Sequence, residues 1–266
     1  MKTETYTLIT GASSGIGAEL AKQSAGRGNN VLIVALEDQN LYEIKDHITK
    51  SYSVKCEVFG INFSLPDAPQ KVIQWVAQND FKVNVLINNA GIGSKNSFEN
   101  LSAEFYQKQL QLNIINMVLL TRLMLPVLKE NKPSYVLNLG SLGGFFSVPE
   151  KSTYTASKAF VYSFSKSLFY ELRKENISVS VICPGGVNSN ENTIKMNRKL
   201  KYIGRKSIFE TEEIAEIALK GMYSKKAVII PGKLNKTFHW LNIFIPAKIK
   251  DSLILREFSR TSQIRY

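Results

Sequence analysis

Short apolar runs, rich in β-branched residues, alternate along the chain with longer segments whose apolar residues recur every three or four positions. The short runs predict seven strands, at Thr5–Thr10, Val31–Ala35, Val54–Phe59, Asn84–Asn88, Tyr135–Leu139, Ser178–Cys183 and Ala227–Ile230. The longer segments predict helices at Gly15–Gly28, Leu41–Lys50, Pro66–Asn79, Ala103–Glu130, Thr153–Glu175 and Thr211–Met222. Because strands this apolar are buried on both faces, the pattern predicts an α/β fold: a doubly wound parallel sheet of Rossmann type, with about seven strands and helices on both faces.

The chain shows no repeat, low-complexity linker or break in composition that would separate two domains. With 266 residues, of which 44% are hydrophobic and 21% charged, it can bury one large core, and we expect residues 1–266 to form a single domain. In a doubly wound sheet, ligands bind beyond the carboxyl ends of the strands. Functional residues are therefore expected directly after strands.

The apolar runs near the two ends of the chain predict no membrane span. Tyr6–Thr10 is too short for a secretory leader and runs into a glycine-rich turn, and Phe238–Ile245 falls well short of the roughly 20 residues of a spanning helix. The two cysteines, Cys56 and Cys183, lie in apolar segments, which indicates buried structural thiols. We expect a cytoplasmic protein without a metal site.

A net charge of +12 raises nucleic-acid binding as a hypothesis. The basic residues are interleaved with few aromatic residues and match no recognition motif, so we expect no nucleic-acid partner. The tail after Pro231 is mainly basic. A second basic segment holds six cations and no acid: Lys195, Arg198, Lys199, Lys201, Arg205 and Lys206.

A glycine-rich turn joins the first predicted strand to the first predicted helix. Glycines allow a tight turn and a close approach of the backbone to a pyrophosphate, and the new helix offers free N–H groups and a partial positive charge. This context predicts a dinucleotide site. Its residues are Gly11, Ser13, Ser14, Gly15, Ile16 and Gly17.

The spacing Gly-x-x-x-Gly-x-Gly in this turn resembles that of the classical short-chain dehydrogenase/reductase family. Asn88-Asn89-Ala90-Gly91 resembles the family's motif beside the adenine ring, and Pro184–Ser189 resembles its Pro-Gly motif near the nicotinamide. Asn62 stands where the family usually has aspartate. The resemblance implies an NAD(P)H site that also includes Leu36, Asn62, Phe63, Asn89, Ala90, Gly91, Pro184, Gly185, Val187 and Ser189.

Tyr154 and Lys158 begin a predicted helix one turn apart, on the same face. An unperturbed tyrosine, with a pKa of about 10, is a poor acid or base at neutral pH, and a nearby ammonium lowers that pKa. Ser141 follows a strand 13 residues before Tyr154, and Asn113 lies in the long helix before it.

These four residues resemble the family's catalytic set. The resemblance implies that Tyr154 exchanges a proton with a carbonyl or alcohol oxygen while a hydride passes to or from the nicotinamide. Ser141 would steady the oxygen, Lys158 would bind the ribose, and both Tyr154 and Lys158 would line the cofactor site. Asn113 would hold a water that resupplies the proton. The expected function is thus NAD(P)-dependent oxidoreduction; the alternative is an inert NAD(P)-binding sensor or scaffold.

The end of the second strand bears on the choice of cofactor. Counted from Gly17, Ala35 falls where NAD-preferring relatives place aspartate, and Leu36 falls where NADP-preferring relatives place arginine. Neither signature is present. A 2′-phosphate would lie near Glu37, whereas a plain ribose could bond to that carboxylate. The sequence therefore favours NAD, although Ala35 and Ser13 leave room for NADP.

The resemblance implies a small carbonyl or alcohol compound as the substrate. It also implies a substrate-covering lid at about residues 190–210, whose cations either only solvate it or attract an anionic substrate. In the C-terminal extension, residues 233–266, the stretch Phe238–Ile245 could complete an apolar pocket or rest on a membrane surface. Both features would suit an apolar substrate with an anionic handle. The long helices Ala103–Glu130 and Thr153–Glu175 resemble those through which the family forms homodimers or homotetramers.

Overall fold

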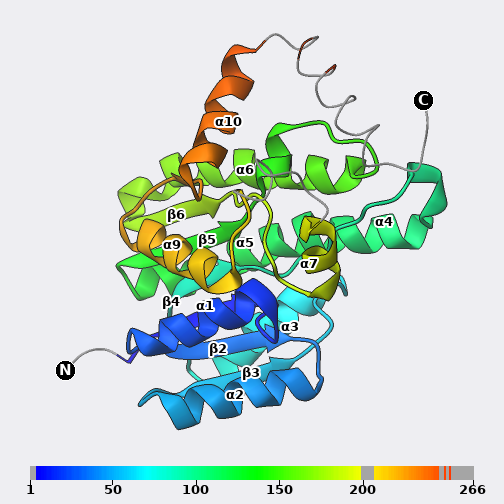
Figure 1. Ribbon diagram of the computed structural model, residues 1–266. Coiled ribbons are helices and arrows are strands. Elements are labelled where there is room, and N and C mark those ends of the chain that lie inside the picture. Colours follow the sequence, from blue (N-terminus) through cyan, green and yellow to red (C-terminus); the bar gives the residue numbers. More distant parts are fainter. Residues whose placement is uncertain (1–3, 199–206, 246–248, 250–251, 253–266) are drawn as a thin grey trace.

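The computed structural model describes residues 4–198, 207–245, 249 and 252. Its strands form one parallel sheet in the order β3-β2-β1-β4-β5-β6-β7, as expected for a doubly wound fold (Figure 1). They are β1 (Tyr6–Thr10), β2 (Asn30–Ala35), β3 (Cys56–Gly60), β4 (Val83–Asn88), β5 (Ser134–Leu139), β6 (Ile177–Ile182) and β7 (Val228–Ile229). The predicted α/β fold class is confirmed.

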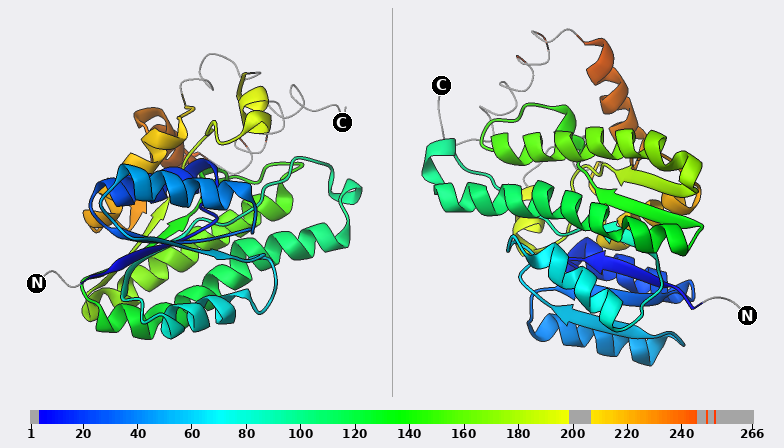
Figure 2. Two further views of the ribbon diagram at one scale, coloured as in Figure 1. Left: turned by 90° about the horizontal axis from the view of Figure 1, so that it is seen from below. Right: turned by 180° about the vertical axis from the view of Figure 1, so that it is seen from behind.

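Helices cover both faces of the sheet (Figure 2). They are α1 (Gly15–Gly26), α2 (Gln39–Ser51), α3 (Ala68–Gln78), α4 (Ala103–Leu110), α5 (Asn116–Glu130), α6 (Ser152–Leu172), α7 (Glu191–Arg198), α9 (Thr211–Tyr223) and α10 (Lys233–Phe244). Alternate strand residues enter opposite cores: Ile9 packs with α1, α2 and α9, and its neighbour Leu8 packs with α3 and α5.

The long helix predicted at Ala103–Glu130 is continuous but not uniformly α-helical. A π-helical segment, Gln111–Ile115, separates α4 from α5. By length and composition alone this helix could cross a membrane, and 33% of its most apolar window is buried in the protein. Because α5 packs against α3 and β4, we assign it as a core helix of the sheet fold.

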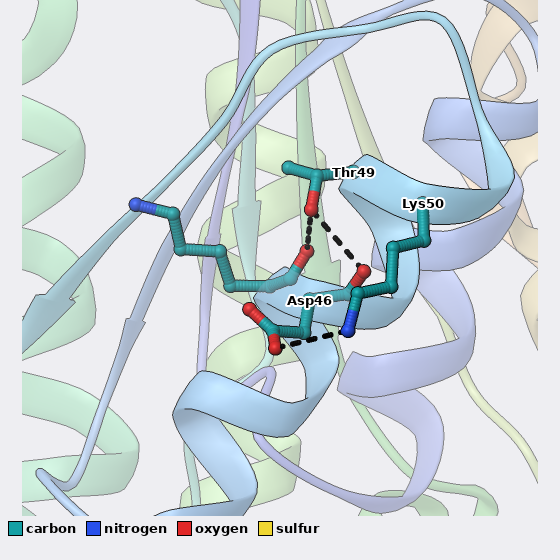
Figure 3. A network of polar contacts seen from close by, with 4 residues as sticks. Asp46, Thr49 and Lys50 are labelled. Atoms are coloured by element: carbon teal, nitrogen blue, oxygen red, sulfur yellow. Dashed lines mark hydrogen bonds and ion pairs between the residues drawn. The ribbon is translucent and has the colours of Figure 1, made fainter.

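Helix α2 follows the end of β2 and packs one side against the core. The side chain of Asp38 caps it by accepting a hydrogen bond from the Leu41 amide at 3.1 Å. Near its end, Thr49 Oγ1 donates to the main-chain oxygen of Asp46 at 3.2 Å, and Lys50 pairs with the Asp46 carboxylate at 3.4 Å (Figure 3). These contacts lie on the exposed side of α2, and the opposite side of the helix packs in the core.

Both cysteines are buried, as expected. Desolvation raises the pKa of each thiol to about 12, although the Lys158 ammonium opposes this for Cys183. At neutral pH both are therefore thiols without nucleophilic reactivity.

Candidate active site

The predicted site residues converge at the carboxyl edge of the sheet. The central strand β1 pairs with β2 on one side and β4 on the other, so the chain reverses its direction of winding at β1. The segments that follow β1, β4, β5 and β6 meet at this crevice, where ligands bind in such sheets.

The glycine-rich turn after β1 needs glycine for two separate reasons. Gly11 and Gly15 have φ of +67° and +56°, a region that strongly favours glycine. At Gly17 the reason is space, because a Cβ there would lie 2.2 Å from the oxygen of Gly11 and 2.4 Å from Nδ2 of Asn89. The three glycines therefore leave the main chain of the turn uncovered by side chains at the start of α1.

Helix α1 begins with Ser14 at its N-cap, and the Ser14 side chain makes no capping hydrogen bond. Ser14 is exposed and Ser13 is half-buried, while Ile16 packs against the core. The first amides of the helix and two hydroxyls are thus available to an anion, which is the arrangement that binds a pyrophosphate.

Asn89 braces the turn from the neighbouring strand. Its Nδ2 donates to the main-chain oxygens of Thr10 and Gly11, at 3.0 and 2.8 Å. In return, the Thr10 hydroxyl accepts from the amides of Asn89 and Ala90, each at 3.1 Å. The Asn-Asn-Ala-Gly motif therefore holds the shape of the phosphate turn, a role that sequence reasoning did not assign.

The end of β2 presents Leu36 and Glu37 to solvent beside the crevice. The Glu37 carboxylate accepts a hydrogen bond from the Tyr42 hydroxyl at 3.2 Å, and its side chain fills the space beside Gly60. Glu37 is thus an acidic group held at the end of β2, on the side where the adenosine ribose is expected.

The segment after β3 is fixed by its own side chains. Asn62 Oδ1 accepts from both the amide and the hydroxyl of Ser64, at 3.0 and 2.7 Å, so only its amide nitrogen is available to a ligand. The Phe63 side chain is buried, which leaves its main chain to contact a cofactor. Asn116 anchors this loop by donating to the oxygens of Phe63 and Leu65, at 2.6 and 2.8 Å; sequence reasoning missed it.

Tyr154 and Lys158 lie one turn apart in α6, and the Lys158 nitrogen is 5.9 Å from the centre of the Tyr154 ring. The ammonium is buried and donates to the oxygen of Leu139 at 2.6 Å. Burial lowers its pKa to about 8. Lys158 therefore stays mainly protonated at neutral pH, with one donor already engaged.

The pKa of Tyr154 differs from the sequence expectation. Desolvation raises it above the ordinary value, and a hydrogen bond with Ser141 only partly opposes this. The expectation that Lys158 would lower it is not borne out, because the buried ammonium is itself destabilised and points to Leu139. In this structure Tyr154 is a protonated phenol, which suits it to donate a proton.

Ser141 begins the 3₁₀ turn Leu142–Phe145 after β5, and its hydroxyl oxygen accepts from the Gly143 amide at 3.1 Å. The preceding residue is Gly140. A Cβ at Gly140 would lie 3.0 Å from both Cys183 Sγ and the Ile182 oxygen. The tight packing against β6 thus explains why glycine stands at this position.

Asn113 is buried in the π-helical segment. Its Oδ1 accepts from the Ile92 amide at 2.9 Å, and its Nδ2 donates to the Ile92 oxygen at 3.0 Å and to Ser157 Oγ at 3.2 Å. The side chain therefore ties the loop after β4 to α6, and the water-holding role expected for Asn113 stays a prediction. Ser157, missed by sequence reasoning, completes this bridge.

The segment after β6 closes over the glycine turn. Pro184 accepts a hydrogen bond from the Leu142 amide at 2.8 Å, and Gly185 packs closely on Asn235 of α10. Val187 bridges to Phe209, and the oxygen of Ser189 would lie 3.3 Å from a Cβ on Gly15. Of the expected lid, residues 190–198 and 207–210 are described, while Lys199, Lys201, Arg205 and Lys206 lie outside the described residues.

Two glycines of the loop after β4 lie close to Lys158 and Tyr154. A Cβ on Gly91 would be 3.6 Å from the Lys158 nitrogen, and a Cβ on Gly93 would be 3.7 Å from the Tyr154 ring. Side chains at these positions would contact Lys158 and Tyr154 directly. The residues present therefore fit a dinucleotide laid across the crevice.

A family model described as short chain dehydrogenase matches residues 5–200. The chain belongs to the short-chain dehydrogenase family. It is an NAD(P)-dependent oxidoreductase, and the comparisons give no support to the alternative of an inert sensor or scaffold.

Curated relatives include enzymes named very-long-chain 3-oxoacyl-CoA reductase. That of Eremothecium gossypii is 29% identical over 244 residues, which cover 89% of this chain and 69% of that protein. That of Anas platyrhynchos is 27% identical over 255 residues, covering 94% and 79%. The match with the rat enzyme covers 67% of this chain and 58% of that protein. The present chain therefore spans little more than half the length of some of its relatives.

Solved structures of the family share the fold. A short-chain dehydrogenase from Sphingobium yanoikuyae in complex with NADPH has a TM-score of 0.78 and 27% identity, covering 98% of this chain and 96% of that one. The 3-ketoacyl-(acyl-carrier-protein) reductase of Brucella melitensis, complexed with NADH, has a TM-score of 0.77 and 25% identity, covering 85% and 96%.

Proposed function

We propose that this short-chain dehydrogenase reduces the carbonyl group of an apolar acyl ketone, with Tyr154 as the general acid. The observation that carries the proposal is the convergence of Tyr154, Ser141 and Lys158 at the carboxyl edge of the sheet, where the glycine turn also lies. When bound, the nicotinamide supplies the hydride. The protein's own groups must then deliver a proton and stabilise the oxygen.

Each side chain has a role that its surroundings support. Tyr154 carries a phenolic proton at neutral pH and donates it to the substrate oxygen. The Ser141 hydroxyl, which hydrogen-bonds Tyr154, donates to the same oxygen and stabilises its developing charge. Lys158, with one N–H engaged by the Leu139 oxygen, holds the ribose with its remaining N–H groups. In oxidation the same groups act in reverse.

The substrate class is inferred from charge near the site and from relatives. The pKa of Lys151, directly before α6, is lowered first by burial and then by the charge of Lys95, although Glu150 raises it. Two ammonium groups and the Glu150 carboxylate thus lie near one another at the start of the catalytic helix, with a net positive charge. They support a substrate with an anionic handle, as do the reductases named for 3-oxoacyl-CoA and 3-ketoacyl carrier-protein substrates.

NAD is proposed as the preferred cofactor, because Glu37 would repel a 2′-phosphate and could accept a hydrogen bond from a ribose hydroxyl. Assembly as a homodimer or homotetramer is proposed from the long helices. Ile115, beside the start of α5, and Phe160 of α6 leave large apolar side chains exposed on this monomer. Catalysis is proposed to take place in the cytoplasm.

The decisive experiment replaces Tyr154 with phenylalanine and follows oxidation of the reduced cofactor with a 3-oxoacyl thioester. Turnover should fall by about 10³-fold or more, because the transferable proton is lost, while the Kd of the cofactor changes little. Tyr162→Phe, two turns further along α6, is the matched control and should retain activity. Substantial turnover by Tyr154→Phe would rule out the assigned acid.

A further inference from the structure

Helix α10 has two faces of different character. Asn235 and His239, one turn apart, face the protein: Asn235 is buried and donates to the Ser207 oxygen at 3.4 Å, and the His239 ring lies 4.3 Å from that of Phe145. One position further along, Lys236 and Trp240 are both exposed, and Phe244 continues the same row at helical spacing. The outward face is therefore apolar at the end of the helix.

The apolar end of this face is large and preformed. Trp240 is 61% exposed and Phe244 is 72% exposed. Their rings stack at 6.3 Å between centroids, with planes 8° apart. In Figure 1 the start of α10 lies beside α6, and the end of the helix projects away from the sheet. Two stacked aromatic rings held in water at the tip of a projecting helix form a surface that gains free energy when it is covered.

The charge around this surface is of one sign. Lys233 and Lys236, on the first turns of α10, are exposed, and neither takes part in an ion pair within the part of the chain that is described. The sequence has no acidic residue between Glu216 and Asp251. Helix α10 thus carries lysines on its first turns and aromatic rings near its end. This arrangement matches an anionic lipid surface, in which an apolar boundary lies beneath negative headgroups.

We propose that α10 docks this short-chain dehydrogenase on an anionic membrane surface. Trp240 and Phe244 enter the boundary between headgroups and acyl chains, and Lys233 and Lys236 contact the headgroups. The helix lies in the membrane surface and does not cross it. Docking itself is independent of the proposed reaction.

The position of α10 connects this surface to the active site. His239 contacts Phe145, the last residue of the 3₁₀ turn that Ser141 begins, and Asn235 packs against Gly185 of the Pro-Gly motif. A docked α10 would hold the substrate side of the crevice near the lipid. This consequence rests on the proposed function, since it is useful only for a substrate that partitions into membranes.

Vesicle flotation with the full-length protein tests the docking. The wild type should float with vesicles of phosphatidylcholine mixed with phosphatidylserine, bind phosphatidylcholine alone weakly, and dissociate at about 1 M salt. Trp240→Ser combined with Phe244→Ser should weaken binding by about tenfold or more, because burial of one such side chain is worth about that factor. Phe98→Ser removes an equally exposed aromatic ring, at 66%, and should change nothing.

A second variant separates charge from folding. Lys233→Glu with Lys236→Glu keeps the aromatic tip and should abolish the preference for phosphatidylserine, with an unchanged circular dichroism spectrum. Absence of wild-type binding, or equal loss with Phe98→Ser, would overturn the proposal. Unchanged vesicle binding by the Trp240→Ser and Phe244→Ser double variant would also overturn it. If that variant then lost a dimer in light scattering, the face would bind a second copy of the chain. If its KM for a water-soluble ketone rose instead, the face would belong to the substrate pocket.

Discussion

The side-chain nitrogen of Lys158 lies 2.6 Å from the main-chain oxygen of Leu139, the last residue of β5. This bond ties the catalytic helix α6 to the strand end from which Ser141 follows. It also places an ammonium in a buried position, where its pKa falls to about 8. The protein therefore holds a charge at neutral pH at a cost to its own stability.

Replacing Lys158 with methionine should stabilise the protein while removing activity. The pKa of lysine falls from 10.5 in the unfolded chain to about 8 in the folded one, so the unfolded state binds more protons between these pH values. The penalty is complete below about pH 8 and disappears as the pH rises through 10.5. At pH 7, Lys158→Met should gain up to about 3 kcal/mol, less about 1 kcal/mol for the lost hydrogen bond.

Urea unfolding of the cofactor-free protein at pH 7 and pH 10 measures this gain, which should shrink at the higher pH. The exposed Lys174→Met, just beyond the end of α6, is the control and should show no such dependence. An unchanged or lower free energy of unfolding for Lys158→Met at pH 7 would contradict the assigned burial penalty.

Ser141→Ala should reduce kcat by about 10²-fold, the scale expected when one donor to a developing oxyanion is lost. The free energy of unfolding should fall by only about 1–2 kcal/mol, because the hydroxyl loses the bond from the Gly143 amide and the bond with Tyr154. Steady-state kinetics and thermal unfolding of the same variant separate the two effects. Ser152→Ala, at the exposed start of α6, should leave kcat unchanged.

Glu37→Gln should improve binding of NADPH relative to NADH by several-fold, because it removes a negative charge near the expected 2′-phosphate. Fluorescence titration of both reduced cofactors gives the ratio of their Kd values. Glu43→Gln, on the exposed face of α2, controls for net charge and should leave the ratio unaltered. If wild-type protein already binds NADPH tenfold more tightly than NADH, the proposed preference for NAD is wrong.

Gly17→Ala should damage both folding and cofactor binding, because the new methyl group would overlap the Gly11 oxygen and the Asn89 amide. We expect a loss of about 1–3 kcal/mol in the free energy of unfolding, as for other overpacked sites. In Gly26→Ala of the same helix, the nearest neighbour of the added Cβ is the Tyr52 ring at 3.4 Å, so this control should be neutral or stabilising. Urea unfolding and cofactor titration of both variants make the comparison.

The features that could be predicted from the sequence depend on residues that are close together along the chain. The strand ends, the glycine turn and the Tyr154-to-Lys158 spacing all follow from residues that are neighbours in sequence, and the sheet topology follows from general rules for crossovers. The roles of Asn89 and Asn116 were not predictable, because each acts through hydrogen bonds to main-chain atoms of distant segments. The sign of the pKa shift of Tyr154 was missed for a similar reason, since burial is a property of the whole fold.

Two helices beyond the predicted set, α7 and α10, also depend on tertiary contacts. Helix α7 has eight residues, too few to be stable alone, and α10 is anchored by the buried Asn235 rather than by a regular apolar stripe. The strand predicted at Ala227–Ile230 was shortened to Val228–Ile229, since it lies at the edge of the sheet and pairs only with β6. The prediction of one domain for residues 1–266 stays a prediction.

The π-helical segment at Gln111–Ile115 has the geometry of an α-helix that carries one additional residue. Both Gln109 and Asn113 reach the same oxygen, that of Ile92, at 3.2 and 3.0 Å. Deleting a single residue within this segment would restore ordinary α-helical winding and rotate everything on one side of it by about 100° relative to the other. Asn113 or its partners would then face the wrong direction, so the length of this helix is under tighter constraint than its composition, and a gap here in any natural variant would mark the loss of the loop anchor after β4.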